Sequence, residues 1–305
     1  MPTFAHHDIL SIKDFSKTDL LHILRRAAQL KKQPHPTLLQ HHVMASCFFE
    51  PSTRTRLSFE GAMQHLGGRV IGFADPAVTS SKKGETLHDT MKIIGQYADV
   101  IVIRHALEGA ARVAAEATDK PVINAGDGRN QHPTQAALDL FTIQECQTKI
   151  DGLHIALMGD LKYQRGIHSL VQALAHFAVR LYFVAPALIQ LPEYLCRELK
   201  TRGISFSFHT SVEEVIKKID ILYLTRIMQE RYEDEQEYAR VKNAFYFHHG
   251  LLQGVKTNLR ILHILPRVTE LDPSIDDTPF AYYFEQAKNG LYVRQALLAL
   301  MLEKA

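Results

Sequence analysis

The chain has 305 residues, an apolar fraction of 46% and a formal net charge of +2 with neutral histidines. This length corresponds to about two ordinary domains, and the small net charge gives no support for a nucleic-acid-binding protein. No apolar run approaches the ~18 residues of a membrane span, and the N-terminus lacks the charged and apolar regions of a secretory signal. We therefore expect a cytoplasmic protein with no membrane or nucleic-acid partner.

Cysteine and histidine usage bears on redox state and on metal binding. Cys47, Cys146 and Cys196 lie far apart in the sequence. Three widely spaced thiols fit a reducing compartment better than a disulfide framework. The 17 histidines show no HExxH or similar ligand spacing. The sequence therefore predicts free thiols and no metal site.

Helical and strand-like patterns alternate along the first half of the chain. A helix is predicted first, and strands separated by helices follow it. The predicted strands are 43–49, 69–73, 100–104 and 122–125, and the predicted helices are 16–32, 53–66, 86–97 and 110–117. This alternation is typical of a mostly parallel sheet that is covered by helices on both faces.

The alternation starts again after a long predicted helix over 134–147. The second set of strands is 154–158, 181–184, 205–209, 221–224, 244–248 and 261–264, and the helices are 167–177, 193–202, 212–217, 282–288 and 291–302. We therefore expect an α/β protein of two domains, each a mostly parallel sheet flanked by helices. The expected boundaries are 1–133 plus 289–305 for the first domain, 134–148 for an interdomain helix and 149–288 for the second domain. The C-terminal helix thus returns to the first domain.

The segment Ser-Thr-Arg-Thr-Arg at 52–56 lies where the first predicted strand gives way to a helix. A helix N-terminus offers unpaired backbone N–H groups and the positive end of the helix dipole. Hydroxyl and guanidinium groups at such a position suit a phosphate. The alternative is simple N-capping by Ser52 or Thr53, but capping alone does not require Arg54 and Arg56 in the same turn. The pattern therefore favours a phosphate site.

Polar and cationic side chains also follow the other predicted strands. In open α/β sheets, ligands bind beyond the carboxyl ends of the strands. The segments at these positions are 52–56, 104–105, 126–135, 159–165, 225–226 and 263–267. Together they predict that anionic small molecules bind in a cleft between the two domains.

These motifs resemble the aspartate/ornithine carbamoyltransferase family over essentially the whole chain. Ser-Thr-Arg-Thr-Arg at 52–56 and His-Pro-Thr-Gln at 132–135 occur in both types of this family. The segments at 80–86 and 159–163 resemble the aspartate type, in particular bacterial catalytic chains that associate with regulatory chains, and the Cys typical of ornithine enzymes is missing from 263–266.

The resemblance implies an activity and its substrates. The family reaction transfers the carbamoyl group of carbamoyl phosphate to L-aspartate and gives N-carbamoyl-L-aspartate and phosphate. This reaction is an early step of pyrimidine (UMP) biosynthesis and requires no cofactor and no metal.

The resemblance also implies roles for residues on the carbamoyl phosphate side. The implied binding residues are Ser52, Thr53, Arg54, Thr55, Arg104, His132, Gln135, Leu265 and Pro266. Ser52 to Thr55 would hold the phosphate, and Arg104, His132 and Thr55 would face the carbamoyl oxygen. The amide of Gln135 and the backbone of Leu265 and Pro266 would receive the carbamoyl amino group. The implied catalytic residues are Arg54, Thr55, Arg104 and His132.

On the aspartate side, Arg165 and Arg226 would bind the two carboxylates, because a guanidinium group suits bidentate recognition. Ser80 and Lys83 lie on the loop that enters the neighbouring subunit's site in this family, where Lys83 would help to bind aspartate. The resemblance therefore implies a homotrimer with shared active sites. Residues 108–112 resemble the segment that meets regulatory chains, which leaves a larger allosteric assembly open.

Two residues depart from the family pattern on the acceptor side. Met228 stands where the family usually has a glutamine that contacts aspartate, and a thioether cannot donate a hydrogen bond. Ile264 replaces a proline that is usually in cis, so the peptide before Ile264 is either a costly cis bond or a trans bond that redirects the loop. Two alternatives stay open: a carbamoyltransferase with another amino acceptor, and a weakly active paralogue that binds carbamoyl phosphate.

Overall fold

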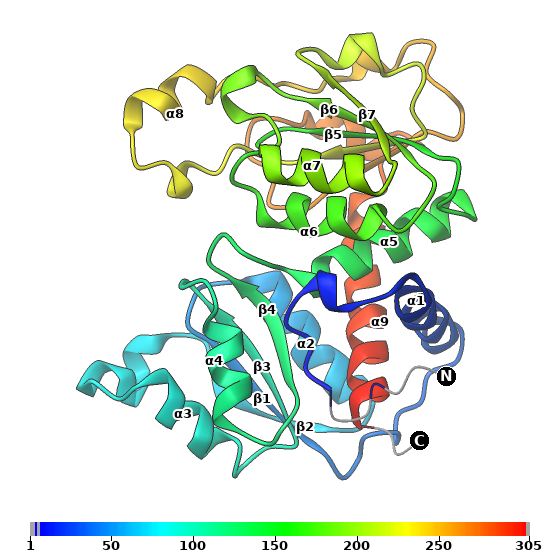
Figure 1. Ribbon diagram of the computed structural model, residues 1–305. Coiled ribbons are helices and arrows are strands. Elements are labelled where there is room, and N and C mark those ends of the chain that lie inside the picture. Colours follow the sequence, from blue (N-terminus) through cyan, green and yellow to red (C-terminus); the bar gives the residue numbers. More distant parts are fainter. Residues whose placement is uncertain (1–3, 5–6, 303–305) are drawn as a thin grey trace. The chain divides into compact units, whose positions relative to one another are not determined.

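A computed structural model describes residue 4 and residues 7–302, so the outermost parts of the predicted first domain lie outside the described residues. The chain divides into two α/β units (Figure 1). Unit 1 comprises Met1–Phe141 and Lys288–Ala305, and unit 2 comprises Thr142–Ala287. Each unit contains one parallel sheet with helices packed against it, which confirms the predicted fold class.

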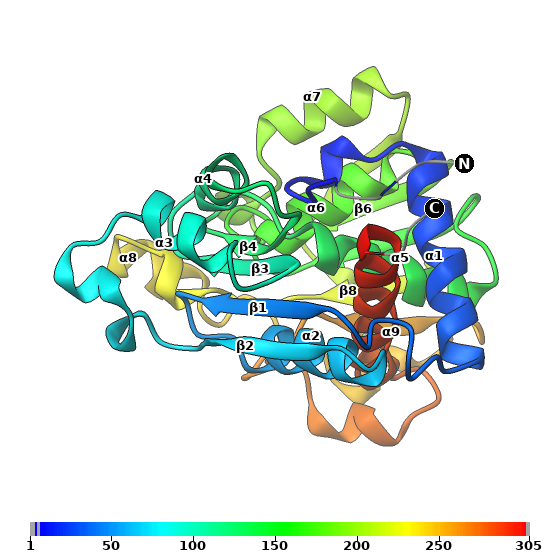
Figure 2. The ribbon, with the colours of Figure 1, turned by 90° about the horizontal axis from the view of Figure 1, so that it is seen from below.

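The sheet of unit 1 has the strand order β2-β1-β3-β4, and every neighbouring pair is parallel. Its strands are β1 Val43–Phe48, β2 Arg69–Phe73, β3 Val100–His105 and β4 Val122–Asp127, and its helices are α1 Lys17–Lys32, α2 Thr53–His65, α3 Leu87–Ile94 and α4 Ala110–Ala117. Figure 2 shows β2 alongside β1, at the edge of the sheet. The central strands β1 and β3 are buried on both faces because helices cover each face.

Side chains that alternate along the strands of unit 1 pack against different helices. Ala45, Cys47 and Ile101 belong to a core cluster that also contains Met91 of α3 and residues of α4. Ser46 points to the opposite face, where its hydroxyl donates to the carboxylate of Glu60 on α2 at 3.0 Å. The period of two along each strand thus assigns α3 and α4 to one face of the sheet and α2 to the other.

The sheet of unit 2 has the order β7-β6-β5-β8-β9 and is also parallel throughout. Its strands are β5 His154–Met158, β6 Arg180–Val184, β7 Ser205–His209, β8 Ile221–Leu224 and β9 Arg260–His263, and its helices include α6 Arg165–Leu174, α7 Glu193–Thr201 and α8 Glu235–Val241. Helices α6 and α7 pack against each other, whereas α8 lies on an extension away from the sheet (Figure 1).

Two helices contribute residues to both units. These are α5 Pro133–Gln147 and α9 Tyr283–Leu302. The C-terminal part of α9 packs within unit 1, where Lys31 Nζ donates to Asn289 Oδ1 at 2.8 Å and the Arg294 guanidinium lies 5.0 Å from the centre of the Phe59 ring. The predicted return of the C-terminal helix to the first part of the chain is therefore present.

The structure corrects four predicted elements. The predicted helices 282–288 and 291–302 form the single helix α9, although Asn and Gly are weak helix formers. Gly290 is accommodated because Arg294 and Leu138 of α5 fill the space that a side chain would need. The predicted helix 212–217 is only the 3-10 turn Val212–Glu214, and the predicted strand 244–248 is reduced to one bridge between Phe247 and Leu271.

The three cysteines are free thiols, with Cys47 and Cys196 buried and Cys146 half-buried. Burial raises the pKa of Cys47 and of Cys146 to about 12, and it also raises the pKa of Cys196. Within residues 4 and 7–302, no helix has the length and apolarity needed to cross a membrane. In the same residues, no group of histidine, cysteine and acidic side chains could hold a metal ion.

Candidate active site

The turn between β1 and α2 leaves the first turn of this helix without a side-chain cap. Ser52 occupies the N-cap position in extended conformation, but its side chain makes no capping hydrogen bond. Thr53 and Arg54 are exposed and Thr55 is buried. Capping by the Ser52 side chain therefore does not explain the motif. The backbone N–H groups, hydroxyls and guanidinium group at this helix start form a compact set of donors for an anion.

The two arginines of the motif have different surroundings. Arg56 Nη1 lies 3.8 Å from Glu60 Oε1, one turn further along α2, and Glu60 also accepts from Ser46. Arg56 thus belongs to the packing of α2 against the sheet. Arg54 is exposed one residue from the N-terminus of the helix, where the dipole favours an anion. The residue pattern by itself did not distinguish these two side chains, whereas the family resemblance implied a role for Arg54 only.

Arg104 lies at the carboxyl end of β3, next to the start of α2. Its Nη2 lies 2.9 Å from Glu50 Oε2, and its Nη1 donates to the carbonyl of Ala125 at 3.3 Å. The backbone also joins these segments, because Phe49 N donates to Arg104 O at 2.8 Å. Glu50 belongs to the turn that begins α2, so Arg104 is held beside that turn.

A buried carboxylate organises the loop between β4 and α5. Asp127 is 2% exposed and accepts hydrogen bonds from Asn124 Nδ2 at 2.8 Å, Gly109 N at 2.8 Å, Asn130 Nδ2 at 3.0 Å and Gln131 N at 3.1 Å. These bonds fix the chain immediately before His132. The supporting role of Asp127 was missed from the sequence, where it read as one more polar loop residue.

His132 and Gln135 are brought together at the start of α5. Both are buried, and the His132 carbonyl accepts from the backbone N–H of Gln135 at 3.0 Å. Within unit 1, the candidate residues Ser52 to Thr55, Arg104, His132 and Gln135 therefore all lie just beyond the carboxyl ends of β1, β3 and β4. This is the edge of a parallel sheet at which ligands bind.

Ser80 and Lys83 belong to a separate part of unit 1. They form a 3-10 turn that ends at Gly84, and both side chains are exposed. The segment before α3 extends away from the sheet of unit 1 (Figure 1). The structure therefore does not attach these two residues to the sheet edge that carries the other candidates of unit 1.

In unit 2, a second buried carboxylate joins the loops that follow β5 and β8. Asp160 is fully buried and accepts from Tyr163 N at 3.0 Å, Met228 N at 3.3 Å and Tyr232 Oη at 3.2 Å. Burial raises the pKa of Asp160. Gly159 lets the two loops approach, since a Cβ at its φ of 128° would lie 2.0 Å from the Thr225 carbonyl. Sequence reasoning gave Asp160 no role of its own.

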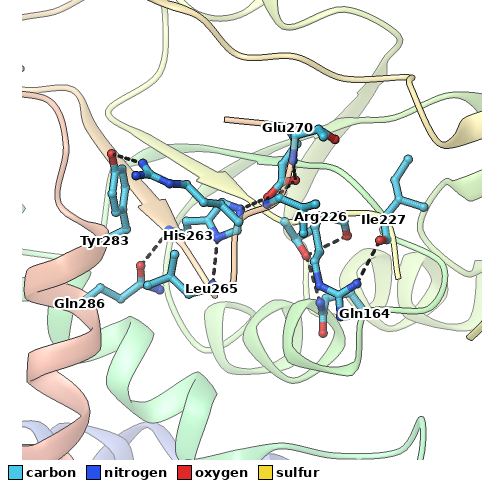
Figure 3. Close-up of polar contacts among 12 residues, drawn as sticks. Gln164, Arg226, Ile227, His263, Leu265, Glu270, Tyr283 and Gln286 are labelled. Atoms are coloured by element: carbon cyan, nitrogen blue, oxygen red, sulfur yellow. Dashed lines mark hydrogen bonds and ion pairs between the residues drawn. The ribbon is translucent and has the colours of Figure 1, made fainter. Parts of the chain in front are cut away.

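Arg165 is the first residue of α6 and is 5% exposed. The preceding Gln164 donates from Nε2 to Thr225 Oγ1 at 3.0 Å, which ties the start of α6 to the end of β8 (Figure 3). On the next turn, His168 Nε2 donates to the carbonyl of Leu161 at 2.9 Å. The sequence did not identify His168, yet it holds the loop that leads to Arg165.

Burial lowers the pKa of His168 below its ordinary value of 6.5, although its bond to Leu161 acts in the opposite direction. Because the unfolded chain binds the proton more readily, His168 reduces stability as the pH falls below about 6.5. We expect His168→Gln, whose amide can also donate to Leu161, to show a smaller drop in Tm between pH 7.5 and pH 5.5 than the unchanged chain. Calorimetry at both pH values measures this difference.

The matched control for that experiment is His249→Gln, because His249 is an exposed histidine of the same unit. This control should retain the Tm difference of the unchanged chain. An equal Tm difference in His168→Gln and in the unchanged chain would show that His168 does not cause the loss of stability in acid.

Arg226 follows β8 and is engaged by Glu230. Its two terminal nitrogens form a bidentate ion pair with the Glu230 carboxylate, in which Nη1 donates to Oε2 at 3.0 Å. Nη1 also donates to the Ile227 carbonyl at 3.2 Å (Figure 3). The bond to Glu230 raises the pKa of Arg226, which stays a cation. The Met228 side chain is half-buried, whereas Gln229 is exposed.

The loop after β9 is held by a buried histidine and a buried glutamate. His263 Nδ1 accepts from Leu265 N at 2.8 Å, so Nε2 carries the ring proton and donates to Glu270 Oε1 at 2.8 Å (Figure 3). Glu270 also accepts from the backbone N–H groups of Val268 and Thr269. Burial alone would raise the pKa of Glu270, but the bond from His263 and the backbone groups lowers it.

The peptide geometry of this loop answers the question raised by Ile264. Within residues 4 and 7–302, the cis peptide is the one between Leu265 and Pro266, so the peptide before Ile264 is trans. Leu265 has a φ of 56°. Its backbone N–H is the group bound by His263, so this histidine fixes the position that the resemblance assigns to carbamoyl binding.

A cavity of about 530 Å³ lies at the opposite, amino-terminal edge of the sheet in unit 2. Asp220, which lines it, accepts from Lys256 Nζ at 2.8 Å, Asn258 Nδ2 at 3.1 Å and His154 N at 2.9 Å. These polar groups already bind one another. None of the candidate residues from the sequence lines this cavity.

The chain matches two models of one protein family. Residues 7–145 match the aspartate/ornithine carbamoyltransferase, carbamoyl-P binding domain, and residues 151–301 match the Asp/Orn binding domain of the same family. The second match includes most of α9, whereas the residues of α9 from Lys288 onward fold with unit 1.

Individual relatives cover nearly the whole chain. The catalytic subunit of aspartate carbamoyltransferase from Vibrio campbellii is 55% identical over 97% of this chain and 96% of its own length. The corresponding subunit from Chromobacterium violaceum is 53% identical over 97% of this chain and 98% of its own length.

Solved structures of aspartate transcarbamoylases are also similar to this chain over nearly its whole length. The catalytic subunit of aspartate transcarbamoylase from M. jannaschii has a TM-score of 0.89 and 46% identity, with 96% of each chain covered. The aspartate transcarbamoylase of Trypanosoma cruzi in complex with carbamoyl phosphate and aspartate has a TM-score of 0.94 and 34% identity, with 99% of each chain covered. With two family models that together span residues 7–301, this chain belongs to the aspartate/ornithine carbamoyltransferase family.

Proposed function

We propose that the chain transfers the carbamoyl group of carbamoyl phosphate to L-aspartate and releases N-carbamoyl-L-aspartate and phosphate. The observation that carries this proposal is the uncapped start of α2 with Ser52, Thr53, Arg54 and Thr55, in a chain 55% identical to an aspartate carbamoyltransferase catalytic subunit. A relative with the same fold binds both substrates, carbamoyl phosphate and aspartate. In this proposal, unit 1 binds carbamoyl phosphate and unit 2 binds aspartate.

The donors of unit 1 suit the charge changes of this reaction. The amine nitrogen attacks the carbamoyl carbon, the carbonyl oxygen gains negative charge, the bond to the phosphate oxygen breaks and the nitrogen loses a proton. Arg104, His132 and Thr55 would stabilise the oxyanion, and losing one such donor typically costs about 10²–10³-fold in rate. Arg54, with Ser52 and Thr53, would balance the charge on the departing phosphate. The amino group of the substrate would meet the Gln135 amide and the backbone of Leu265 and Pro266.

Aspartate brings two carboxylates, and unit 2 offers Arg165 at the start of α6, after β5, and Arg226 in the segment after β8. Arg226 binds the Glu230 carboxylate in bidentate fashion, and in this proposal a carboxylate of aspartate would take the place of Glu230. Lys83 and Ser80 would come from a neighbouring subunit. Their exposure on a segment that extends from unit 1 supports a homotrimer with shared sites.

The pathway, the cellular compartment, the domain boundaries and the assembly of the chain belong to the same proposal. We assign the chain to pyrimidine biosynthesis in the cytoplasm, with residues 1–133 and 289–305 as the carbamoyl phosphate-binding domain and residues 149–288 as the aspartate-binding domain. Residues 134–148, most of them in α5, would join the two domains. Association with regulatory chains through residues 108–112 would give an allosteric assembly. Size measurement of the purified chain alone and with a regulatory chain separates the trimer from this larger assembly.

Formation of carbamoyl aspartate, measured with aspartate varied at saturating carbamoyl phosphate, tests the function. We expect saturable dependence on aspartate. Activity with other amines but not with aspartate would favour the alternative of a different acceptor, which Met228 supports through its lower polarity. Tight binding of N-(phosphonacetyl)-L-aspartate, a molecule that joins both substrate groups, would support the aspartate enzyme. Binding of phosphate compounds alone would favour a paralogue without this activity.

Met228 gives a specific expectation for the acceptor side. We expect Met228→Gln to lower the KM for aspartate by about 3- to 10-fold, because one neutral hydrogen bond contributes about 0.5–1.5 kcal/mol. The KM for carbamoyl phosphate should stay the same. Steady-state kinetics with each substrate varied in turn measures both values.

The neighbouring Gln229 provides the control for this change. Gln229 is exposed, so Gln229→Ala should leave the KM for aspartate unchanged. A raised KM in Gln229→Ala, together with no effect of Met228→Gln, would instead mean that Gln229, one residue after the family's glutamine position, contacts aspartate.

A further inference from the structure

The side-chain amide of Gln135 is oriented by a buried carboxylate. Gln135 and Asp139 lie one turn apart in α5 and are 8% and 0% exposed. Gln135 Nε2 donates to Asp139 Oδ1 at 2.9 Å. A carboxylate can only accept hydrogen bonds, so the NH₂ end of the Gln135 amide must face Asp139. The carbonyl end, Oε1, is then the part of this amide that can meet a ligand.

Arg294 of α9 is a buried cation on which the charge of Asp139 acts. Arg294 is 3% exposed, its guanidinium lies 5.0 Å from the Phe59 ring centre, and its Nε is buried without a hydrogen-bond partner. Burial lowers the pKa of Arg294 to about 10, while the charge of Asp139 acts to raise it. At neutral pH Arg294 is therefore a buried cation that interacts with the charge of Asp139.

We propose that Asp139, supported by Arg294, is a positioning residue that presents Gln135 Oε1 to the amino group of carbamoyl phosphate. This inference rests on the role proposed above for Gln135. A carbamoyl NH₂ group donates hydrogen bonds and therefore needs an acceptor. If the Gln135 amide were reversed, its own NH₂ group would face the carbamoyl NH₂, and two donors cannot bind each other. The fixed orientation favours a carbamoyl group over an acetyl group, which has a methyl in place of the NH₂.

Acetyl phosphate is therefore the matched ligand for a test. It shares the phosphate and the carbonyl with carbamoyl phosphate but lacks the amino group. In Asp139→Asn, the new amide can face Gln135 with either end, so the orientation of Gln135 is no longer fixed. We expect the KM for carbamoyl phosphate to rise by about 3- to 10-fold, the effect of one neutral hydrogen bond. The inhibition constant of acetyl phosphate should change by less than about twofold, because no hydrogen bond to this ligand is lost.

Asp139→Asn alone leaves Arg294 as an uncompensated buried cation and can prevent folding. The second variant, Asp139→Asn with Arg294→Met, removes both buried charges and should fold, because neither change then leaves the other side chain as an uncompensated buried charge. Its kinetic changes should match those expected for the single variant. A Tm measurement on each purified protein shows that the comparison is made on folded enzyme.

Gln135→Ala tests the contact of Gln135 with carbamoyl phosphate separately from the positioning role of Asp139. If Asp139 acts through Gln135, adding Asp139→Asn to Gln135→Ala produces no further rise in the KM for carbamoyl phosphate. An unchanged KM in Gln135→Ala alone would overturn both the proposed contact of Gln135 and this inference. A raised KM in Gln135→Ala, without any effect of the Asp139 variants, would overturn only the positioning role. An equal change for carbamoyl phosphate and acetyl phosphate would also overturn it, since a loosened fold affects both ligands.

Discussion

Replacing Arg54 by alanine is expected to lower kcat by about 10²–10³-fold, the usual effect of removing one preorganised charge from a developing anion. Arg54 is exposed at the start of α2, so its loss should not disturb the core. The Tm should therefore stay close to that of the unchanged chain. Carbamoyl aspartate formation at saturating concentrations of both substrates, with a calorimetric scan of each protein, measures the two quantities.

Arg56→Ala is the control from the same helical turn. Arg56 lies 3.8 Å from Glu60 on an adjacent turn of α2, so its replacement removes a positive charge from the motif without removing the proposed phosphate ligand. We expect kcat to change by less than about threefold, because a partly exposed ion pair contributes little. Equal losses in both variants would mean that the total charge of the turn matters and that Arg54 has no specific role.

Replacing Arg226 by alanine is expected to raise the KM for aspartate by about 10²-fold, because each hydrogen bond between charged groups is worth about 1.5–3 kcal/mol. The KM for carbamoyl phosphate should remain within about twofold of the original value, since that ligand is assigned to unit 1. Arg226→Lys should recover only part of the loss, because lysine lacks the planar pair of donors. Initial rates over a wide range of aspartate concentrations measure these effects.

Arg197→Ala is the matched control for this experiment. Like Arg226, Arg197 lies four residues from its glutamate partner, with Arg197 Nη1 at 2.9 Å from Glu193 Oε1, but it sits on the exposed side of α7. Its replacement should leave both KM values unchanged. If Arg226→Ala also left the KM for aspartate unchanged, Arg226 would be a structural partner of Glu230. The residue that binds the aspartate carboxylate would then have to be sought elsewhere in unit 2.

Much of the fold could be predicted because its central strands are buried on both faces and several helices, such as α1 and α7, have one buried apolar face. Buried parallel strands such as β1 and β5 form short apolar runs bounded by turn residues, and the alternation with helices predicts a parallel sheet. The order β7-β6-β5-β8-β9 could not be predicted, because the hydrophobic pattern along one strand does not say which strand lies beside it. The wrong prediction of a strand at 244–248 has the same cause. Its phenylalanines are buried, but in the described part of the chain this segment forms only the bridge between Phe247 and Leu271.

The candidate site likewise contains residues that the sequence can predict and residues that it cannot. The side chains that we propose to bind anions are recognisable by residue type and by their place at or after a strand end, as at Arg54, Arg104 and Arg226. The residues that hold them are not, because a buried acid looks like any other acid in the sequence. Asp160 meets Met228 N across 68 positions of the chain, and only the tertiary structure brings them together. Asp139 was missed because its residue type does not show that it is fully buried or that Gln135 donates to it.

The burial of the three thiols has a practical consequence for labelling chemistry. Maleimides and alkylating reagents react with the thiolate, and a thiol whose pKa is about 12, as for Cys47 and Cys146, has almost no thiolate at neutral pH. Burial also raises the pKa of Cys196, which is 9% exposed. A cysteine introduced at an exposed position, for example beside Lys83, would therefore react much faster than the native ones. Fluorophores or spin labels could report on that segment without first removing the cysteines of the natural sequence.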